Sequence, residues 1–480
     1  MIVFLYVINN YIFVVNKIKI KVYMVNNEKI LKLIFLPLLL NSGVLSSQSL
    51  SFSEAQAVMD RDNSLIKAVQ KEEEAYTYEW KASKGNRYPQ LSVFGGGLYL
   101  NKELGTNLNG AKNEFSNLLG VSNPEILGNW DINILKRDIA FGGVGIIWPV
   151  FTGGKINALI ESSKIKTDIG HEELVSTKNK LISELVERYF QVKLAEEAVL
   201  VRKEALEGMN KHLYDATKLE QQGIIAPVEK LQADVAVSEA NRQYSASLKD
   251  LSLSKVALAN TLELDEANFD LTTQFFLVDN LQSLAYYQDK ALTNYPELLK
   301  LKLQIDLAEQ GIKSKKSSYY PTIDAFGQSV LLHNNPVGVS KKNEKPWMVG
   351  VTLTYNLFEG FKNKNEIKAA KVTKESAELH EIKAKKDIKN QIEKIYQDLE
   401  KQNEQIQNLQ IQIVQAEELL RVRSRSFAEG IASSTDVVDA EVNLSGIKLQ
   451  KLEAQYNYVL DLADLLEYSG LSYEFTQYAN

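Results

Sequence analysis

The side chains that usually carry out chemistry are few in this chain and stand far apart. The absence of Cys excludes a disulfide framework, a thiol nucleophile and a thiolate metal site. No Gly-rich phosphate loop and no Gly-x-Ser-x-Gly elbow occurs in the sequence. The four His residues lack the spacing of a metal-ligand pair, so we interpret them as surface or packing residues: His171, His212, His333 and His380. We therefore expect neither an enzyme nor a cofactor or metal site.

Acidic residues are plentiful, and most occupy positions expected on solvated helix faces. One pair stands out because Asp436 and Asp439 follow a Gly-Ile turn and lie one helical turn apart on one face. Ser433, Ser434 and Thr435 precede them as candidate N-caps, and acids in a first turn interact favourably with the helix dipole. On the residues alone, an ordinary capping function remains open for this pair.

Residues 1–47 are predicted to form a leader. Lys29 and Lys32 precede an apolar run over 33–40, and small or polar residues follow, which is the order of a secretory signal peptide. The run is too short to span a bilayer as a helix. We expect translation to start at Met24, because residues 1–23 are unusually apolar for the region before a signal peptide. A genuine N-terminal membrane anchor is the alternative.

The exported chain is predicted to be acidic. The formal charge of the full sequence is −6, and the leader removes more Lys than acidic residues. An acidic chain without a basic patch is a poor partner for nucleic acid. No segment after the leader has the ~18 apolar residues of a transmembrane helix, so entry into a membrane would require β-strands.

Two copies of one pattern follow the leader. Residues 88–95 recur at 320–327, an offset of 232 residues. The stretches 143–155 and 223–235 recur at 350–362 and 430–442, and both offsets are 207. Three motifs in the same order indicate an internal duplication. The first copy is 25 residues longer between the first two motifs, where an Asn/Gly-rich stretch at about 101–133 predicts a longer surface loop.

Each copy predicts a helix, two strands separated by a loop, and two very long helices. The first helices, 54–86 and 296–318, end at a Tyr-Pro pair because the residue before Pro leaves the helical region. Apolar and small or polar residues then alternate, which predicts a strand; a soluble half-buried sheet would alternate in the same way. The predicted strands are 89–101 and 139–151 in the first copy, then 321–333 and 346–358 in the second.

The long helices set the fold class. They are expected over 157–222 and 228–262, and again over 363–429 and 435–468, each pair turning at a Gly. The longer helix of each pair, 157–222 or 363–429, would reach about 100 Å, far beyond the average globular helix. We predict a mainly α fold with long antiparallel coiled-coil hairpins and a membrane β part. The predicted parts are a leader, a first repeat, a connecting equatorial segment, a second repeat and a tail: 1–47, 48–262, 263–283, 284–470 and 471–480.

Closure of the strands predicts the assembly. Four strands in one chain cannot close a barrel, and an open sheet edge is excluded in lipid. Three copies supply twelve strands, which can close. The same three copies supply twelve helical segments, too many to fill their own centre easily. We therefore expect a homotrimer in which a twelve-stranded β-barrel continues into a helical tube.

The duplicated order resembles the TolC outer-membrane efflux family over the whole mature chain. Further matches are the stretches 50–55 and 291–298, the Tyr-Pro strand entries and the Gly-Ile turns. The resemblance implies an outer-membrane barrel in a Gram-negative bacterium with a periplasmic α-barrel extension. It also implies a passive exit duct of a tripartite efflux or type I secretion system. The implied partners are outer-membrane lipid, a periplasmic adaptor (membrane fusion) protein and an inner-membrane efflux pump or ABC exporter.

The resemblance also implies site residues at the hairpin tips. An acidic entrance gate falls on Asp436 and Asp439, with Glu229 at the equivalent place in the first repeat. Threefold symmetry would gather these carboxylates around a narrow axis, where such rings favour cations. Adaptor docking is implied for the turn residues Gly223, Ile224, Gly430 and Ile431.

One departure concerns the closed tip. The family is best known for holding it with an aromatic hydroxyl and a basic residue, but Phe427 and Ala432 stand at these positions. Arg423 and Arg425, one turn earlier, are the candidates to replace them. A different class of protein also remains open, namely a periplasmic coiled-coil scaffold or adaptor that never enters a membrane. The exported substrate is not specified by the sequence.

Overall fold

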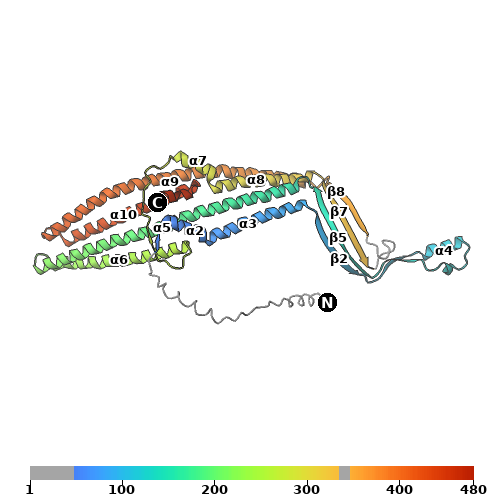
Figure 1. The fold of residues 1–480 in the computed structure, drawn as a ribbon, viewed down its shortest axis with the longest axis horizontal. Coiled ribbons are helices and arrows are strands. Elements are labelled where there is room, and N and C mark those ends of the chain that lie inside the picture. Colours follow the sequence, from blue (N-terminus) through green and yellow to red (C-terminus); the bar gives the residue numbers. More distant parts are fainter. Residues whose placement is uncertain (1–47, 334–345, 480) are drawn as a thin grey trace, which may run out of the picture. The chain divides into compact units, whose positions relative to one another are not determined.

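A computed structural model describes residues 48–333 and 346–479, and Figure 1 shows their course. The predicted leader, 1–47, lies outside the described residues. The chain from Ser49 onward forms one compact unit. Long helices and a few strands make up this unit, which confirms the predicted fold class. Within the described part of the chain, no helix combines the length and the apolar character needed to cross a membrane.

The first repeat begins with two short helices separated by one residue. Asn63 ends α2 (Phe52–Asp62) and caps α3 (Ser64–Lys84) by accepting hydrogen bonds from the Leu65 and Ile66 amides. Strand β2 (Gln90–Tyr99) follows the Tyr-Pro pair, and β5 (Asp138–Phe151) returns. The hairpin helices are α5 (Lys155–Gln221) and α6 (Pro227–Thr261).

The second repeat has the same order. Its elements are α7 (Leu284–Asn294), α8 (Pro296–Lys316), β7 (Thr322–His333), β8 (Trp347–Thr354), α9 (Lys362–Ala428) and α10 (Ser434–Tyr468). Strand β8 ends four residues earlier than expected, and the chain then turns through Phe361, whose φ of 64° is left-handed. Helices α5 and α9 each contain 67 residues, and α6 and α10 each contain 35.

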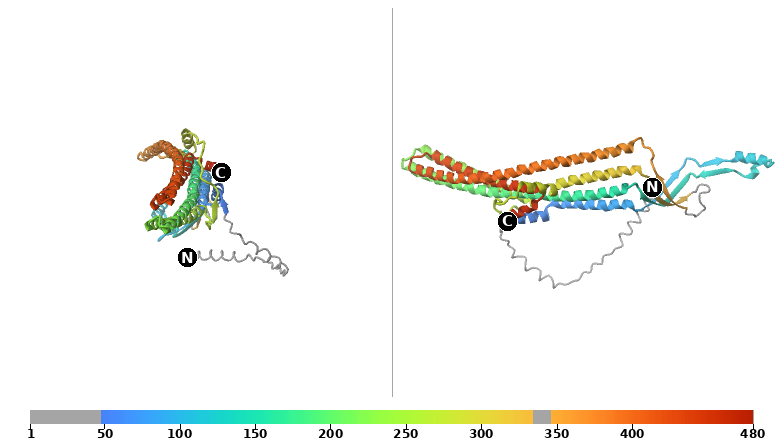
Figure 2. Two further views of the ribbon diagram at one scale, coloured as in Figure 1. Left: turned by 90° about the vertical axis from the view of Figure 1, so that its left-hand side faces the viewer. Right: turned by 90° about the horizontal axis from the view of Figure 1, so that it is seen from above.

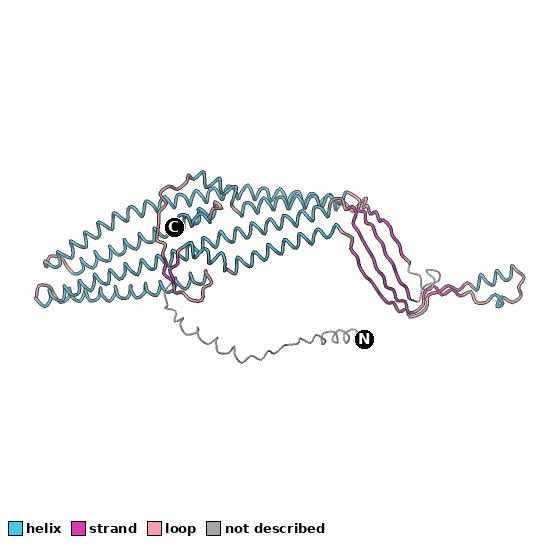
Figure 3. The backbone as a smooth tube through the Cα atoms, viewed as in Figure 1, coloured by secondary structure: helices cyan, strands magenta, loops and turns pink. Residues whose placement is uncertain are grey.

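The four long strands form one antiparallel sheet, drawn in magenta in Figure 3. Its order is β2-β5-β7-β8, so the two repeats meet where β5 pairs with β7, and Val144 lies opposite Ser329. A register shift near Pro149 interrupts this ladder because Pro has no amide hydrogen to donate. Strands β2 and β8 are the two edges of the sheet.

Each 67-residue helix has different neighbours along its length. Near the strands, α5 packs against α3 and α8, and α8 packs against α9. Beyond them, α5 packs against α6 and α10, and α10 packs against α9. The resulting order across the hairpins is α6-α5-α10-α9, with the two hairpins side by side in Figure 2. The turns therefore lie at the opposite end of α5 from the sheet.

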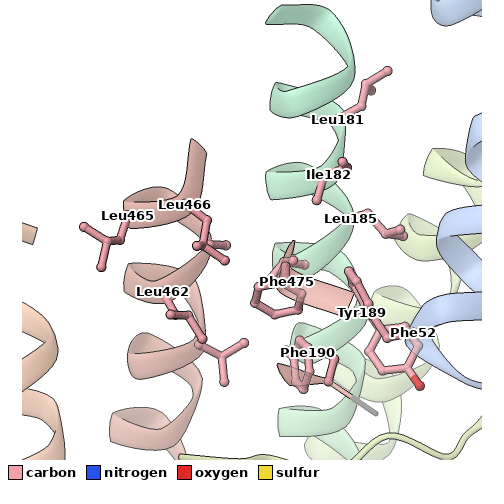
Figure 4. Packing of buried hydrophobic residues seen from close by; sticks show 14 of the residues in the cluster. Phe52, Leu181, Ile182, Leu185, Tyr189, Phe190, Leu462, Leu465, Leu466 and Phe475 are labelled. Carbon is pink, nitrogen blue, oxygen red and sulfur yellow. The ribbon is translucent and has the colours of Figure 1, made fainter. Parts of the chain in front are cut away.

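The largest hydrophobic cluster lies where these two sets of neighbours meet. Figure 4 shows Phe52, Tyr189, Phe190 and Phe475 packed together, facing α10. The Phe52 and Phe475 rings are 4.9 Å apart at their centroids. Short strands β1 (Gln48–Leu50) and β6 (Phe269–Leu271) pair beside them, and the Tyr189 hydroxyl donates to the Leu50 carbonyl at 2.7 Å. Segments from both repeats and the C-terminal tail, with α11 (Phe475–Tyr478), are thus joined in one core.

The stretch predicted as a surface loop is folded instead. Strands β3 (Leu104–Asn107) and β4 (Asp131–Leu135) pair with each other, and α4 (Asn109–Leu118) and a short 3-10 helix, η2 (Pro124–Leu127), lie between them. Its Asn residues form the turns, since the Asn107 side chain accepts from the Asn109 amide and the Asn123 side chain from the Glu125 amide. An Asn/Gly-rich composition therefore indicated turns here, not a lack of structure.

Candidate functional site

The first hairpin turns on a left-handed glycine. After α5 ends, Gly223 has a φ of 73° and donates its amide hydrogen to the Glu220 carbonyl at 2.9 Å. The next amide, of Ile224, donates to the Leu219 carbonyl at 2.9 Å, which satisfies the last carbonyls of the helix. The Ile224 side chain is 54% exposed. Pro227 then opens α6, where a missing amide hydrogen carries no cost.

The second hairpin turns in the same way but begins its return helix with a capping box. Gly430 has a φ of 72°, and the following Ile431 side chain is 77% exposed. The Ser433 hydroxyl accepts from the Asp436 amide at 3.2 Å, while the Asp436 carboxylate accepts from the Ser433 amide at 3.0 Å. These reciprocal bonds satisfy amides that have no partner within the helix.

The two tips contact each other. A Cβ atom placed on Gly430 would lie 3.4 Å from the Ile224 Cγ2 atom. The Glu229 carboxylate, from α6, accepts the Ser434 amide hydrogen at 2.6 Å, and so caps α10 from the other hairpin. Beside it the Thr435 hydroxyl donates to the Gln232 side chain at 3.2 Å. The four turn residues and Glu229 are thus brought to one end of the molecule.

The different partners of Glu229 and Asp436 follow from one residue. These acids are equivalent in the duplication, 207 residues apart. Asp436 caps its own helix because Ser433 offers it an amide and a hydroxyl. The N-cap of α6 is Ala226, whose side chain makes no capping hydrogen bond, so the Glu229 carboxylate is available to α10.

A buried histidine joins the same contact. His212, on α5, is 7% exposed, and its Nε2 atom lies 2.7 Å from the Ser434 hydroxyl. Its ring meets the buried ring of Phe427, on α9, edge-on at 4.6 Å. Burial lowers the pKa of His212, while the charges of Asp215 and Glu229 oppose this shift. All four hairpin helices therefore meet through His212, Glu229, Phe427 and Ser434, which we call the tip node.

The predicted gate acids have three different environments. Asp436 pairs with Arg423, whose Nη1 atom lies 3.0 Å from the Asp436 Oδ1 atom. Hydrogen bonds from Ser433 lower the pKa of the Asp436 carboxyl, and Arg423 adds to this shift. Asp439 is exposed one turn further along α10, and Glu229 belongs to the tip node. Of the two arginines named as candidates to hold the closed tip, Arg425 instead pairs with Glu429 at 3.0 Å.

Sequence reasoning missed the tip node. His212 and Ser434 are 222 residues apart, and nothing in their local sequence indicates a contact. The sequence showed that Phe427 stands where the family has an aromatic hydroxyl, and the structure explains why this position is apolar. Phe427 fills a small core together with Ala216, Ala233 and Val437.

A cleft of about 200 Å³ lies beside the node, between the hairpins. His212, Asp215, Phe427 and Glu441 are among its lining residues. Burial raises the pKa of Glu441, whereas the charge of Lys448 opposes the shift. In the part of the chain that the structure describes, no group of acidic or His side chains is arranged to hold a metal ion.

Comparison with known proteins assigns the family. The family model described as outer membrane efflux protein matches residues 59–262 and 288–471, which include most of both repeats. Alkaline protease secretion protein AprF of Pseudomonas aeruginosa is 21% identical over 242 residues, covering 50% of each chain. Outer membrane efflux protein BepC of Brucella suis is 20% identical over 354 residues, covering 72% of this chain and 77% of that protein. The chain thus spans about half the length of AprF.

Solved structures agree in fold. CusC superposes with a TM-score of 0.74 at 13% identity, over 88% of this chain and 93% of CusC. The open state of the MtrE outer membrane channel of Neisseria gonorrhoeae gives 0.70 at 16% identity, over 88% and 89%. The two matched segments, the paired hairpins and the shared sheet lead to one conclusion. This chain belongs to the outer membrane efflux protein family, whose members lie in the outer membrane.

Proposed function

We propose that this protein is a passive exit duct, through which substrates from an inner-membrane pump cross the periplasm and the outer membrane. The family match over both repeats carries the proposal. The fold supports it, since a sheet at one end and two hairpin tips at the other are joined by the continuous helices α5 and α9. Helices of 67 residues reach about 100 Å, a length suited to the periplasm and not to a compact enzyme.

The working assembly is proposed to be a homotrimer. One chain leaves β2 and β8 unpaired at the edges of its sheet, and α6 and α9 at the edges of its hairpin layer. Both outer helices expose apolar side chains: Val228, Leu231 and Val235 on α6, and Ile411, Val414 and Val422 on α9. Joining β8 and α9 of one copy to β2 and α6 of the next covers both edges, and three copies give twelve strands in a closed ring.

The tips are the proposed periplasmic entrance. Asp436 and Asp439 would form the acidic constriction, and Glu229 would position it by holding α10 against the first hairpin. Ile224 and Ile431, exposed beside Gly223 and Gly430, would dock a periplasmic adaptor protein. AprF is a secretion protein and BepC an efflux protein, so either an ABC exporter or an efflux pump suits this duct as its inner-membrane partner.

Fractionation tests the proposal against the periplasmic scaffold. The duct should be recovered with the outer membrane and run as a heat-sensitive trimer on a gel. Reconstituted in a planar bilayer, the same material should conduct ions. Recovery in the soluble periplasmic fraction, without trimers and without conductance, would support the scaffold and overturn the duct. Deleting the gene and testing growth on toxic compounds, and protein secretion in parallel, would then identify the class of pump.

A further inference from the structure

The connection between β2 and β5, which contains the folded insert of residues 104–135, is 25 residues longer than the connection between β7 and β8. It joins the far ends of the two strands, because Tyr99 pairs with Asp138 and the Leu100 amide donates to the Arg137 carbonyl at 2.7 Å. The near ends of the same strands lead to α3 and α5. The insert therefore lies beyond the sheet, at the end opposite the hairpin tips (Figure 1).

The insert holds its own shape. The Asn109 side chain accepts the Trp130 amide at 2.9 Å and donates to the Asn129 side chain at 2.9 Å. The Phe115 and Trp130 rings lie 6.0 Å apart, so α4 is fixed against the β3–β4 ribbon. A segment with this many internal contacts presents a defined surface.

That surface has an inverted polarity. Helix α4 buries Lys112 and Ser116, which are 3% and 0% exposed. Both donate to loop carbonyls, Lys112 to Gly128 at 3.0 Å and Ser116 to Val121 at 2.8 Å. The large apolar side chains of this region point outward instead: Leu118 is 83% exposed, Leu119 56% and Ile126 76%. A helix in water normally does the reverse, so three apolar side chains on so small a unit indicate a covering partner.

Charge and position identify the partner. The insert carries three acids (Glu114, Glu125 and Asp131), and its one basic residue, Lys112, is buried and lies 3.5 Å from Glu125. Lys136 and Arg137, which follow directly, are exposed basic residues at the base of the insert, but within 104–135 no exposed cation is offered to a phosphate-rich lipid or polysaccharide surface. The insert grows directly from β2, the sheet edge that meets the next copy in the proposed trimer. Threefold symmetry would place three identical apolar patches on the same rim.

We propose that the patch of Leu118, Leu119 and Ile126 packs against the inserts of the other two copies and forms a cap over the outer mouth of the duct. This inference rests on the proposed trimer. Self-association suits the patch because identical apolar surfaces are stabilised by removing each other from water. The cap lies at the end of the protein away from the acidic tips. Apolar contacts therefore close this end, whereas charged and hydrogen-bonding side chains gather at the other.

The absence of Cys allows a direct test in the full-length protein in outer membranes. Leu118→Cys and Ile126→Cys are made separately, with Asn113→Cys as the matched control. Asn113 is exposed on the same helix, about 140° around its axis from Leu118. Membranes are treated with a thiol oxidant or a short bis-maleimide and then denatured. Both patch variants should give covalent dimers of protomers, and the control should give at least several-fold less.

The outcomes separate this inference from the proposed function. Heat-sensitive trimers without covalent dimers at either patch position would overturn the cap and leave the duct intact. Cross-linking to a species of another mass would also overturn it, in favour of a foreign partner. Absence of any trimer would overturn both proposals. As a second measurement, Leu118→Asp with Ile126→Asp should raise single-channel conductance if trimers still form, and unchanged conductance would count against a cap.

Discussion

At the scale of residues, Asp436 and Glu229 occupy equivalent positions in the duplication, yet one neighbouring side chain gives them different partners. Asp436 caps its own helix and pairs with Arg423, whereas Glu229 reaches the amide of Ser434 in the other hairpin. Their shared position could be predicted from the duplication, but their partners could not. From the sequence, both acids were assigned to the same acidic entrance gate.

The proposed acidic constriction makes a prediction about ion selectivity. Asp436→Asn together with Asp439→Asn keeps the side-chain size and the capping geometry but removes two charges per chain. We expect the preference for cations over anions to fall in single-channel recordings of the trimer, because a ring of carboxylates attracts cations. Unchanged selectivity would contradict the ring.

A matched control follows from the ion pair. Arg423 places a positive charge 3.0 Å from Asp436 and so offsets part of the ring's charge. Arg423→Gln should therefore shift selectivity in the opposite direction, toward cations. The two variants together distinguish an electrostatic effect from a general loosening of the tip, which would move both in the same direction.

The buried histidine makes a prediction about pH. Burial lowers the pKa of His212, and exposure to water on opening would restore a value near 6.5. The open tip then binds more protons than the closed one, so acidification below about pH 6.5 should favour opening, down to the pKa of the buried ring. Amide protection factors over 424–437, which correct for the slower intrinsic exchange in acid, should fall as the pH is lowered from 7.5 to 5.5.

His212→Gln supplies the control for this pH dependence. Glu441 faces the same cleft, and its raised pKa acts with the opposite sign, since a carboxyl protonates more readily when buried. Comparing the variant with the wild type removes the contribution of Glu441. The acid-dependent loss of protection should disappear or reverse in the variant. Identical profiles would show that His212 does not titrate in this range.

At the scale of elements, apolar periodicity indicated where the long helices run, whereas composition did not indicate how the insert folds. The first long helix was expected over 157–222, and α5 runs from Lys155 to Gln221 because heptad-like apolar spacing extends without Pro between two glycines. The insert at 104–135 was missed because its helix hides polar residues and exposes apolar ones, so its pattern resembles that of a loop. The largest hydrophobic cluster was also not predicted, since Phe52, Phe190 and Phe475 meet only in the folded chain.

The contact between hairpins makes a prediction at this scale. Glu229→Ala removes the acceptor of the Ser434 amide at the start of α10. Loss of a helix cap typically costs about 1 kcal/mol, so the amides of 433–436 should exchange several-fold faster. Glu229→Gln, which keeps an acceptor oxygen, should lose less. Equal protection in all three proteins would show that this contact does not hold the hairpins together.

For the whole molecule, the duplication predicted the fold class, while the assembly stays a proposal. The sheet and the hairpin layer of one chain each expose two edges, one from each repeat: β2 and α6 from the first, and β8 and α9 from the second. A single chain can satisfy neither layer alone. The contacts that cross between repeats, such as His212 with Ser434, depend on how the two copies sit together, which no local pattern encodes.

The matched helix lengths limit how such a chain can change over evolution. Because α5 equals α9 and α6 equals α10 in length, both turns arrive at the same level, where Gly430 meets Ile224. Seven residues added to both helices of one hairpin would keep its packing register but displace its turn by about 10 Å. Such an insertion should abolish the node and the trimer's closed entrance, whereas the same insertion in both hairpins should restore them. Homologous chains should therefore gain or lose residues in both hairpins together.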